Sequence, residues 1–383
     1  MATVFWLAAA LVAFAYAGYP LLMALWARWH ARPVVPGDSL ATIDVVLVVH
    51  DAATQVEAKL RNLLELDYPA ERLRINLACD GCSDATETIA RAIGSPRIRV
   101  FAFGQRRGKS ACIAELIPQL GADLILFTDV RQRIDPDAAR MLAMTLADPH
   151  VGAASGELVL EADNGYGRGI DAYWRYEKLL RRLESASGSI VGATGALYVA
   201  RRALLVPPPA GIILDDMWIP LAIAAGGHRV VFVPQALAHD RGATDSASEE
   251  TRKRRTLAGN YQLLHRWPQL ALPCAHPLAL RLWGHKWLRL AAPWCLLALL
   301  ASNLWLARGG DTFYLASLAL QTAAYLLALS ARLRPSLATA WLPARLCGAF
   351  LSLNLSAALA LVDYLRNPQA HLWQTTRLEA ARQ

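Results

Sequence analysis

The chain has 383 residues, of which 55% are hydrophobic, and its mean hydropathy of +0.27 is too high for an ordinary soluble protein. Its 39 lysines and arginines outnumber 31 acidic residues, giving a net charge of +8. This excess fits basic loops facing an anionic lipid leaflet better than a polyanionic partner, and no nucleic-acid partner is expected.

The first apolar segment predicts a membrane anchor. Residues 4–26 carry no charge, which is long enough to cross a bilayer, and Arg28 and Arg32 follow directly. A signal peptide would need a basic start and a cleavage site of small residues, a pattern that the sequence does not follow. The positive-inside rule places the two arginines, and the domain after them, in the cytoplasm. We therefore expect residues 1–32 to be an uncleaved transmembrane anchor.

Residues 40–270 predict one α/β domain, because strand and helix patterns alternate along them. The predicted strands are 42–49, 73–79, 98–103, 124–127 and 230–233, and the predicted helices are 57–66, 84–93 and 109–120. Such alternation favours a doubly wound, mostly parallel sheet. The carboxyl ends of its strands would meet at one edge, which is where ligands bind in sheets of this kind.

Charged side chains follow several of these strands. Asp80 ends the second strand, and Asp129 ends the apolar run 124–127. Position alone leaves two interpretations of Asp129 open, a ligand for a metal or nucleotide and a cap for the next helix. The basic loop that ends at Lys109 could hold a diphosphate, or it could be a solvated surface loop.

The second half of the domain adds further candidates. Asp215 and Asp216 suit a general base beside a supporting acid, or the acidic first turn of a helix. His239 follows the last strand and could bind a metal, although a lone histidine is more often structural. Cys79 and Cys82 have zinc or redox spacing. We expect no functional role for them, because a second cysteine pair is missing and a cytoplasmic domain does not favour a disulfide.

The last third of the chain predicts more membrane helices. Residues 276–290 combine tryptophan with basic side chains, which indicates an amphipathic interfacial helix. Residues 291–365 contain three apolar spans, and 366–383 form a basic tail. One anchor plus three spans would put this tail outside. Either one segment therefore lies in the membrane interface, or the tail is external.

Taken in order, nearly the whole chain resembles a family 2 glycosyltransferase with a GT-A fold, of the kind found in membrane-embedded polysaccharide synthases and glycolipid glucosyltransferases. Asp80-Gly81-Cys82-Ser83-Asp84 is similar to the nucleotide loop of that family, and Phe127-Thr128-Asp129 to the start of its metal-binding Asp-x-Asp motif. Gly192–Tyr198 resembles part of the acceptor-side block, and Asp215-Asp216 resembles the base motif.

The resemblance implies an inverting transfer from a nucleoside-diphosphate sugar, such as a UDP-sugar, to a polysaccharide or lipid-linked glycan at the cytoplasmic membrane face. It also implies Mg²⁺ or Mn²⁺ as cofactor and a bacterial inner-membrane location with several spans. The implied site residues are Asp216 as base and Asp215 as supporting acid, Asp80, Lys109 and Arg255 for the nucleotide and diphosphate, and Asp129 with His239 for the metal.

The chain also departs from the family pattern. Arg131 stands where the second carboxylate of Asp-x-Asp is usual, and the first strand ends His50-Asp51 in place of a Tyr-Asn-Glu sequence. The tryptophan that follows the arginine in processive synthases is missing after Arg255, which weakens the case for long-chain synthesis. Two alternatives remain open: a glycolipid synthase with a membrane-lipid acceptor, and a non-catalytic nucleotide-binding subunit of a polysaccharide biosynthesis complex.

Overall fold

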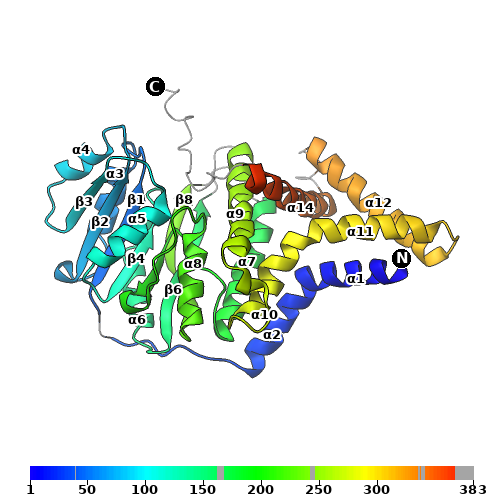
Figure 1. Ribbon diagram of the computed structural model, residues 1–383, viewed down its shortest axis with the longest axis horizontal. Helices are drawn as coiled ribbons and strands as arrows, with labels where there is room; N and C mark the ends of the chain where they lie inside the picture. Colours follow the sequence, from blue (N-terminus) through cyan, green and yellow to red (C-terminus); the bar gives the residue numbers. More distant parts are fainter. Residues whose placement is uncertain (39, 162–167, 242–245, 335–336, 338–340, 367–383) are drawn as a thin grey trace.

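The computed structural model describes residues 1–38, 40–161, 168–241, 246–334, 337 and 341–366. Figure 1 shows a sheet with helices on both faces at one end, and a group of long helices projecting from it. The helices are α1 (Ala2–Ala13), α2 (Tyr19–Trp29), α3 (Val56–Leu64), α4 (Thr86–Ala92), α5 (Lys109–Leu116), α6 (Ala138–Thr145), α7 (Arg168–Ala186), α8 (Asp215–Ala225), α9 (Ser246–Arg266), α10 (Ala279–Leu282), α11 (Leu288–Ala307), α12 (Thr312–Leu333) and α14 (Leu342–Arg366).

The sheet has eight strands in the order β3-β2-β1-β4-β7-β6-β8-β5. Its strands are β1 (Ile43–Val49), β2 (Leu73–Asp80), β3 (Ile98–Phe103), β4 (Leu124–Thr128), β5 (Arg133–Ile134), β6 (Val151–Glu161), β7 (Tyr198–Arg201) and β8 (Arg229–Arg241). β1 runs parallel to both β2 and β4, and β2 runs parallel to β3. β7 is antiparallel to β4 and β6, whereas β6 and β8 are parallel.

The central strands are apolar on both sides because helices cover both faces of the sheet. β1 and β4 are buried over their whole length. Leu47 points into one core, formed with α3 and α6, while Val48 points into a second core, formed with α5 and α8. The prediction of a doubly wound, mostly parallel α/β sheet is therefore confirmed.

Three strands were not predicted, and one is longer than predicted. β5, β6 and β7 lie in the part of the sheet that contains the antiparallel pairings. β8 continues to Arg241, whereas the prediction ended at residue 233. Residue 234 is a proline, which in a sequence usually indicates the end of a strand. In the structure, β8 continues past Pro234, and its pairing with β6 shifts register between Ser155 and Glu157.

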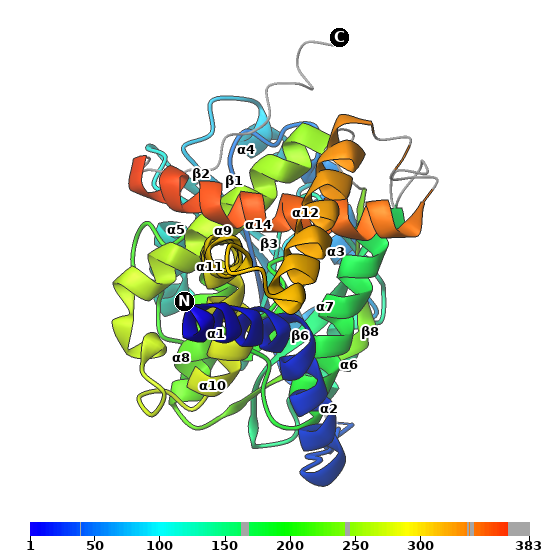
Figure 2. The same cartoon turned by 90° about the vertical axis from the view of Figure 1, so that its right-hand side faces the viewer.

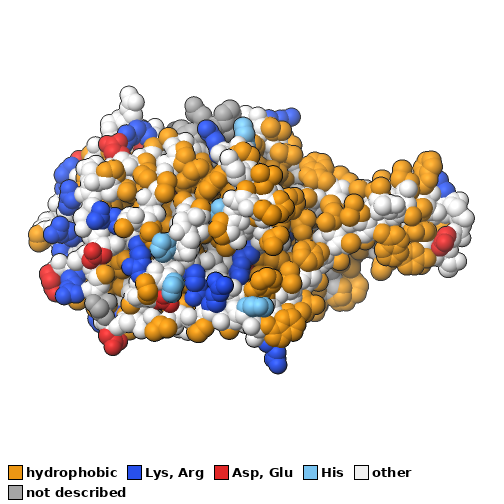
Figure 3. Space-filling view, turned by 60° about the horizontal axis from the view of Figure 1, so that its bottom comes forward, with side chains coloured by type: hydrophobic (Ala, Val, Ile, Leu, Met, Phe, Trp, Pro, Cys, Tyr) orange, Lys and Arg blue, Asp and Glu red, His pale blue; other side chains and the backbone are white. Residues whose placement is uncertain are grey.

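Four helical stretches in the described residues are long and apolar enough to cross a membrane: Ala2–Trp29, Ala279–Ala307, Thr312–Leu333 and Leu342–Arg366. The first bends at a π-helical turn, Phe14–Gly18, which divides α1 from α2. α1, α11 and α12 pack together as the projecting arm, and Figure 3 shows its surface covered by apolar side chains. Exposed Trp6, Leu297 and Leu320 belong to this surface. Such a surface is consistent with membrane association.

Candidate functional site

The candidate site lies at the carboxyl edge of the parallel strands. Asp129 follows β4, which is paired with β1 in the middle of the sheet. Lys109 begins α5, and Asp215 and Asp216 begin α8. Segments that are far apart in sequence therefore deliver four charged side chains to one place.

Lys109 holds the acids together. Its Nζ lies 2.9 Å from Oδ1 of Asp129 and 3.3 Å from Oδ2 of Asp215. Burial alone would lower the pKa of Lys109, but Asp129 and Asp215 outweigh that effect and raise it. The lysine therefore stays positively charged in the absence of ligand and is able to meet an incoming anion.

Asp216 has the properties of a general base. Burial and the neighbouring charge of Asp215 raise its pKa to about 6, while Lys109 acts in the opposite direction. Its Oδ2 accepts a hydrogen bond from the backbone N–H of Gly195 at 3.1 Å. A carboxylate whose pKa lies close to neutral pH combines a large ionised fraction with useful basicity.

Gly195 keeps the space beside these acids open. A Cβ at this position would lie 3.3 Å from Oδ2 of Asp216, 3.4 Å from Oδ2 of Asp129 and 3.7 Å from Nζ of Lys109. The absent side chain therefore leaves a small space that both carboxylates face. The sequence resemblance placed Gly195 in the acceptor-side block without giving it this role.

Asp80 is fully buried and organises the loop that carries Lys109. Its two carboxylate oxygens accept hydrogen bonds from the backbone N–H groups of Arg107, at 2.7 Å, and Gly108, at 2.8 Å. Gly108 has a φ of 89°, which a residue with a side chain rarely adopts, so the turn before α5 depends on glycine. The structure gives Asp80 this supporting role, and a direct contact with nucleotide stays a prediction.

Lys59 supports the loop after β4, and sequence reasoning missed it as a site residue. The side chain is buried beneath that loop, where Nζ donates hydrogen bonds to Oγ1 of Thr128 at 2.8 Å and to the carbonyl oxygen of Gln132 at 2.6 Å. Burial lowers the pKa of Lys59 to about 7, opposed by the charge of Asp129. A lysine on the apolar face of a predicted helix was the available signal, since lysine is seldom buried without partners.

Arg131, which replaces the usual second carboxylate, is paired with Asp240. Its Nη2 lies 2.6 Å from Oδ2 of Asp240, and Nε2 of Gln132 donates to the same oxygen at 2.9 Å. Asp240 is buried and belongs to β8. The carboxylate of Asp240 thus approaches the segment after Asp129, where it forms an ion pair with the guanidinium of Arg131.

His239 lies next to Asp240 in the strand and contacts a different set of residues. Its Nε2 is 3.0 Å from Oδ1 of Asp135, and its Nδ1 is 3.1 Å from Oε1 of Glu161. Successive side chains of a strand point to opposite faces, so two neighbouring residues of β8 serve different sites. The structure does not bring His239 into the cluster with Lys109, and its role as a metal ligand stays a prediction.

Arg255 reaches the acids from α9. Its guanidinium is largely buried, which lowers its pKa, and Asp215, Asp129 and Asp216 act in the opposite direction. These are the acids that surround Lys109, so the helix after β8 contributes a second cation to the site. This position is the one expected for a residue that binds a diphosphate.

The residues at the site fit a divalent ion bound together with a diphosphate. Oδ1 of Asp129 is held by Lys109, while its Oδ2 faces the space beside Gly195. Mg²⁺ often uses one or two carboxylates and fills its remaining positions with water and substrate phosphate oxygens. With Arg131 engaged by Asp240, Asp129 is the carboxylate of the loop after β4 that would hold such an ion, and its role as a metal ligand stays a prediction.

Comparisons with known proteins agree with this architecture. Residues 42–268 match the family described as Glycosyltransferase like family 2. An N-acetylglucosaminyltransferase of Sinorhizobium fredii is 26% identical over 247 residues, which are 58% of this chain and 59% of that protein. A beta-monoglucosyldiacylglycerol synthase of Synechocystis is 24% identical over 255 residues, 61% of this chain and 51% of that protein. The chain thus spans between half and three-fifths of the length of these relatives.

A solved structure extends the similarity to the helical arm. A mannosyltransferase of Pyrobaculum calidifontis, in complex with GDP-Man and Mn²⁺, superposes with a TM-score of 0.70 at 24% sequence identity. The match covers 94% of this chain and 99% of the other, so the two share the arrangement of sheet domain and long helices. The protein therefore belongs to glycosyltransferase family 2 and has a GT-A type fold.

Proposed function

We propose that this protein transfers a sugar, with inversion, from a nucleoside-diphosphate sugar to an acceptor at the membrane surface. The observation that carries the proposal is the convergence of Lys109, Asp129, Asp215 and Asp216 around the space beside Gly195. This space combines cations for a leaving diphosphate with a partly protonated carboxylate for an attacking hydroxyl. The relatives that match point to UDP-linked N-acetylglucosamine or glucose as the first donors to test.

In the proposed reaction, Asp216 removes the proton of the acceptor hydroxyl as its oxygen attacks the anomeric carbon. Attack from the face opposite the diphosphate inverts that carbon, and the diphosphate leaves toward Lys109 and Arg255. Asp215 keeps the pKa of Asp216 raised and helps to hold Lys109 in place. Positioned acid–base groups of this kind commonly contribute about 10²–10⁴-fold to a rate.

Charge balance supports a divalent cation in the same site. Asp129, Asp215 and ionised Asp216 place three negative charges at the site, and a diphosphate would add more. Asp129 would hold Mg²⁺ or Mn²⁺, which supplies Lewis-acid stabilisation of the leaving diphosphate when bound. His239 is not included, because its contacts lie with Asp135 and Glu161.

The link between the site and the apolar helices supports a membrane-bound acceptor. α9 carries Arg255 to the acids, and the adjacent Arg254 makes a two-point ion pair with Asp363 of α14, with distances of 2.8 and 2.6 Å. The hydroxyl of Tyr261 donates to the carbonyl oxygen of Ala357 at 3.2 Å. An acceptor that diffuses in the membrane, such as a lipid-linked glycan or a membrane lipid, would meet the site at this junction.

The arrangement of helices also suggests how the protein lies in the membrane. Figure 2 shows α11 nearly end-on, while α14 lies across it. α14 packs against α9 of the sheet domain and against α12, with Gly348 close to Ala331. We infer that α1, α11 and α12 enter the bilayer and that α14 lies in its interface. The catalytic domain would then be cytoplasmic, as the arginines after the anchor favour, and the side on which the tail lies stays a prediction because the tail is outside the described residues.

The experiment is a screen of the purified protein in lipid nanodiscs. Release of nucleoside diphosphate is measured from UDP-N-acetylglucosamine, UDP-glucose and GDP-mannose, with Mn²⁺ or with chelator, and with lipid or oligosaccharide acceptors. We expect one donor to be turned over in the presence of Mn²⁺. Asp129→Asn should lose the part of nucleotide binding that depends on Mn²⁺, and Asp216→Asn should keep it.

Two results would contradict the proposal. No release from any donor with any acceptor would leave the site without the proposed activity. Equal nucleotide affinity in wild type and Asp129→Asn, with and without chelator, would remove Asp129 from the metal site. Acceptor preference then separates the two classes, because a lipid synthase needs only bilayer lipid, whereas glycan extension needs a glycan end.

A further inference from the structure

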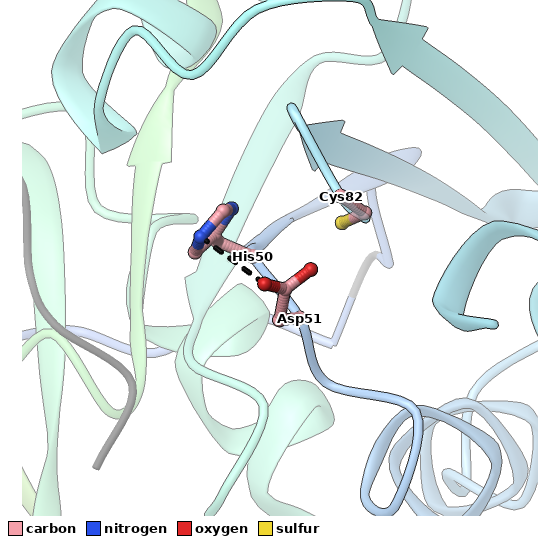
Figure 4. Close-up of side chains that lie close together, drawn as sticks. All are labelled: His50, Asp51 and Cys82. Atoms are coloured by element: carbon pink, nitrogen blue, oxygen red, sulfur yellow. Dashed lines mark ion pairs between the residues drawn. The ribbon is translucent and has the colours of Figure 1, made fainter. Parts of the chain in front are cut away.

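A second group of possible metal ligands lies on the same edge of the sheet as the catalytic acids. His50 and Asp51 follow β1, and Cys82 follows β2, the neighbouring parallel strand. Figure 4 shows the three side chains turned toward one another. One ligand atom from each lies within 4.8 Å of the other two, and all three residues are partly buried. The proposed sugar transfer gives these three side chains no role, although Cys82 lies in the loop that resembles the family's nucleotide loop, and His50 and Asp51 stand where the family has other residues.

The hydrogen bonding of His50 fixes which ring nitrogen is available. Nδ1 lies 2.8 Å from the backbone carbonyl oxygen of Asp80, and a carbonyl only accepts, so the proton is on Nδ1. Nε2 of the neutral ring therefore carries a lone pair. A histidine that ligates a metal usually donates its other N–H to a carbonyl or carboxylate in this way.

The free nitrogen of His50 faces a carboxylate at a distance that suits coordination. Nε2 lies 3.5 Å from Oδ2 of Asp51, whereas a charge-assisted hydrogen bond would be about 2.7–2.9 Å long. Two ligands bound tetrahedrally at about 2.0–2.1 Å from Zn²⁺ lie about 3.3–3.4 Å apart. A lone pair and a carboxylate at this separation are placed to share a cation.

Asp51 is also held in position. Its Oδ1 accepts a hydrogen bond from the backbone N–H of Ser83 at 2.7 Å, and the Ser83 hydroxyl donates to Oδ2 at 3.1 Å. The backbone of Asp51 has a φ of 46°, in the left-handed region that residues other than glycine rarely adopt. The loop after β1 thus keeps an uncommon conformation that turns the carboxylate toward His50 and Cys82.

We propose that Nε2 of His50, Oδ2 of Asp51 and Sγ of Cys82 bind a Zn²⁺ ion. One nitrogen, one oxygen and one sulfur match the preference of zinc, whereas a thiolate does not suit Mg²⁺ or Mn²⁺. Three protein ligands leave a fourth position for water, as in open zinc sites. The bound ion would tie the loop after β1 to the loop after β2, one strand away from the strand that carries Asp129.

The test uses Co²⁺, which replaces Zn²⁺ and gives a thiolate-to-metal absorption that is independent of catalysis. The full-length protein in detergent, freed of metal under reducing conditions, is titrated with Co²⁺ and then with Zn²⁺. We expect about one Co²⁺ per chain with thiolate absorption, displaced by Zn²⁺. Cys82→Ser and His50→Ala should abolish the absorption, and thermal melting confirms that both variants are folded.

Matched variants make the result specific. Cys274→Ser removes an exposed cysteine between α9 and α10 and should leave the absorption unchanged. Asp129→Asn should also leave it unchanged, which separates this ion from the proposed diphosphate-bound ion. Absorption that survives in folded Cys82→Ser, or wild-type protein that binds no Co²⁺ at stoichiometric concentration, would overturn the proposal. A Cys79–Cys82 disulfide that persists in reductant would overturn it as well.

Discussion

Asp216→Asn is expected to lower transfer activity and to raise the stability of the fold, and both effects should depend on pH through the raised pKa of Asp216. The substitution removes the proposed general base, so transfer should fall by about 10²–10⁴-fold. Nucleotide binding should remain, because Lys109, Arg255 and Asp129 are untouched. In the wild type, the rate should rise with pH through about 6, where Asp216 ionises, and then level off.

The same pKa fixes the sign of the stability effect. The carboxyl of Asp216 titrates at about 6 in the folded protein, against 3.8 without the fold, so the folded state keeps its proton longer. Wild-type stability therefore falls as the pH rises from about 4 to about 6, and the loss persists above that range. Each pKa unit corresponds to about 1.4 kcal/mol, which gives about 1–3 kcal/mol because Asp216 is only partly buried.

The assay is thermal melting of wild type and Asp216→Asn between pH 4 and 8, beside transfer rates at each pH. At about 2–4 °C per kcal/mol, the variant should melt a few degrees higher above pH 6 and show no advantage near pH 4. Asp67→Asn is the control, since Asp67 pairs with Arg140 on the surface, 2.8 Å apart. Near-normal turnover would refute the base assignment, and a loss of stability at every pH would refute the electrostatic reasoning.

Four further substitutions test the surroundings of the base and the membrane junction. Lys109→Met should weaken donor binding and move the acidic limb of the pH–rate profile upward, because the lysine lowers the pKa of the base. Gly195→Ala should reduce turnover with little change in melting, since its Cβ would enter the space between the carboxylates. Arg131→Asp should lower the free energy of unfolding by about 1–3 kcal/mol, because Asp240 would lose the guanidinium at 2.6 Å and face a second acid, while Arg252 at 3.7 Å remains. Glu184→Gln should destabilise by about 3–5 kcal/mol, measured by melting, because Glu184 is fully buried within hydrogen-bonding distance of two side chains from the apolar helices.

These four predictions have distinct contradicting results. An unchanged pH–rate profile in Lys109→Met would separate the lysine from the base, and full activity in Gly195→Ala would mean that substrates do not use that space. Glu57→Gln is the control for the buried acids, because Glu57 pairs with Arg61 on an exposed helix surface and should change stability by less than about 0.5 kcal/mol. If Arg131→Asp and Glu184→Gln cost no more than this control, the contacts of the buried Asp240 and Glu184 do not stabilise the fold.

Hydrophobic patterns predicted the first half of the sheet closely, because β1, β2 and β4 are buried along nearly their whole length. The runs that became β1, β2, β3 and β4 are apolar and are separated by amphipathic helices, so length and composition identified them within a residue or two. The first part of β6 is made of small residues, as in Ala154-Ser155-Gly156, and β7 has only four residues, so the pairing of both strands depends on distant segments. Local patterns do not contain that information.

The candidate site was predicted in part for the same reason. Asp129, Asp215, Asp216 and Lys109 stand at the ends of elements, where the chain order of a parallel sheet indicates convergence, and the structure brings them together. To decide which of two neighbouring strand residues faces the site, the register of the strand must be known, because a shift of one residue exchanges the two faces of the sheet. Sequence reasoning selected His239, whereas the neighbouring residue is the one that contacts the loop after Asp129.

The exchange of a carboxylate for Arg131 is best understood together with Asp240. A second acid after β4 would lie beside the buried carboxylate from β8, and the two would repel each other unless a cation bound between them. With arginine at 131, the pair neutralises itself at 2.6 Å and needs no ion. The free site therefore keeps its loop in place by an internal ion pair, and in the proposed reaction the divalent ion would depend on Asp129 and on the diphosphate that arrives with the donor. It follows that metal affinity without nucleotide should be weak, and that metal and donor should bind cooperatively.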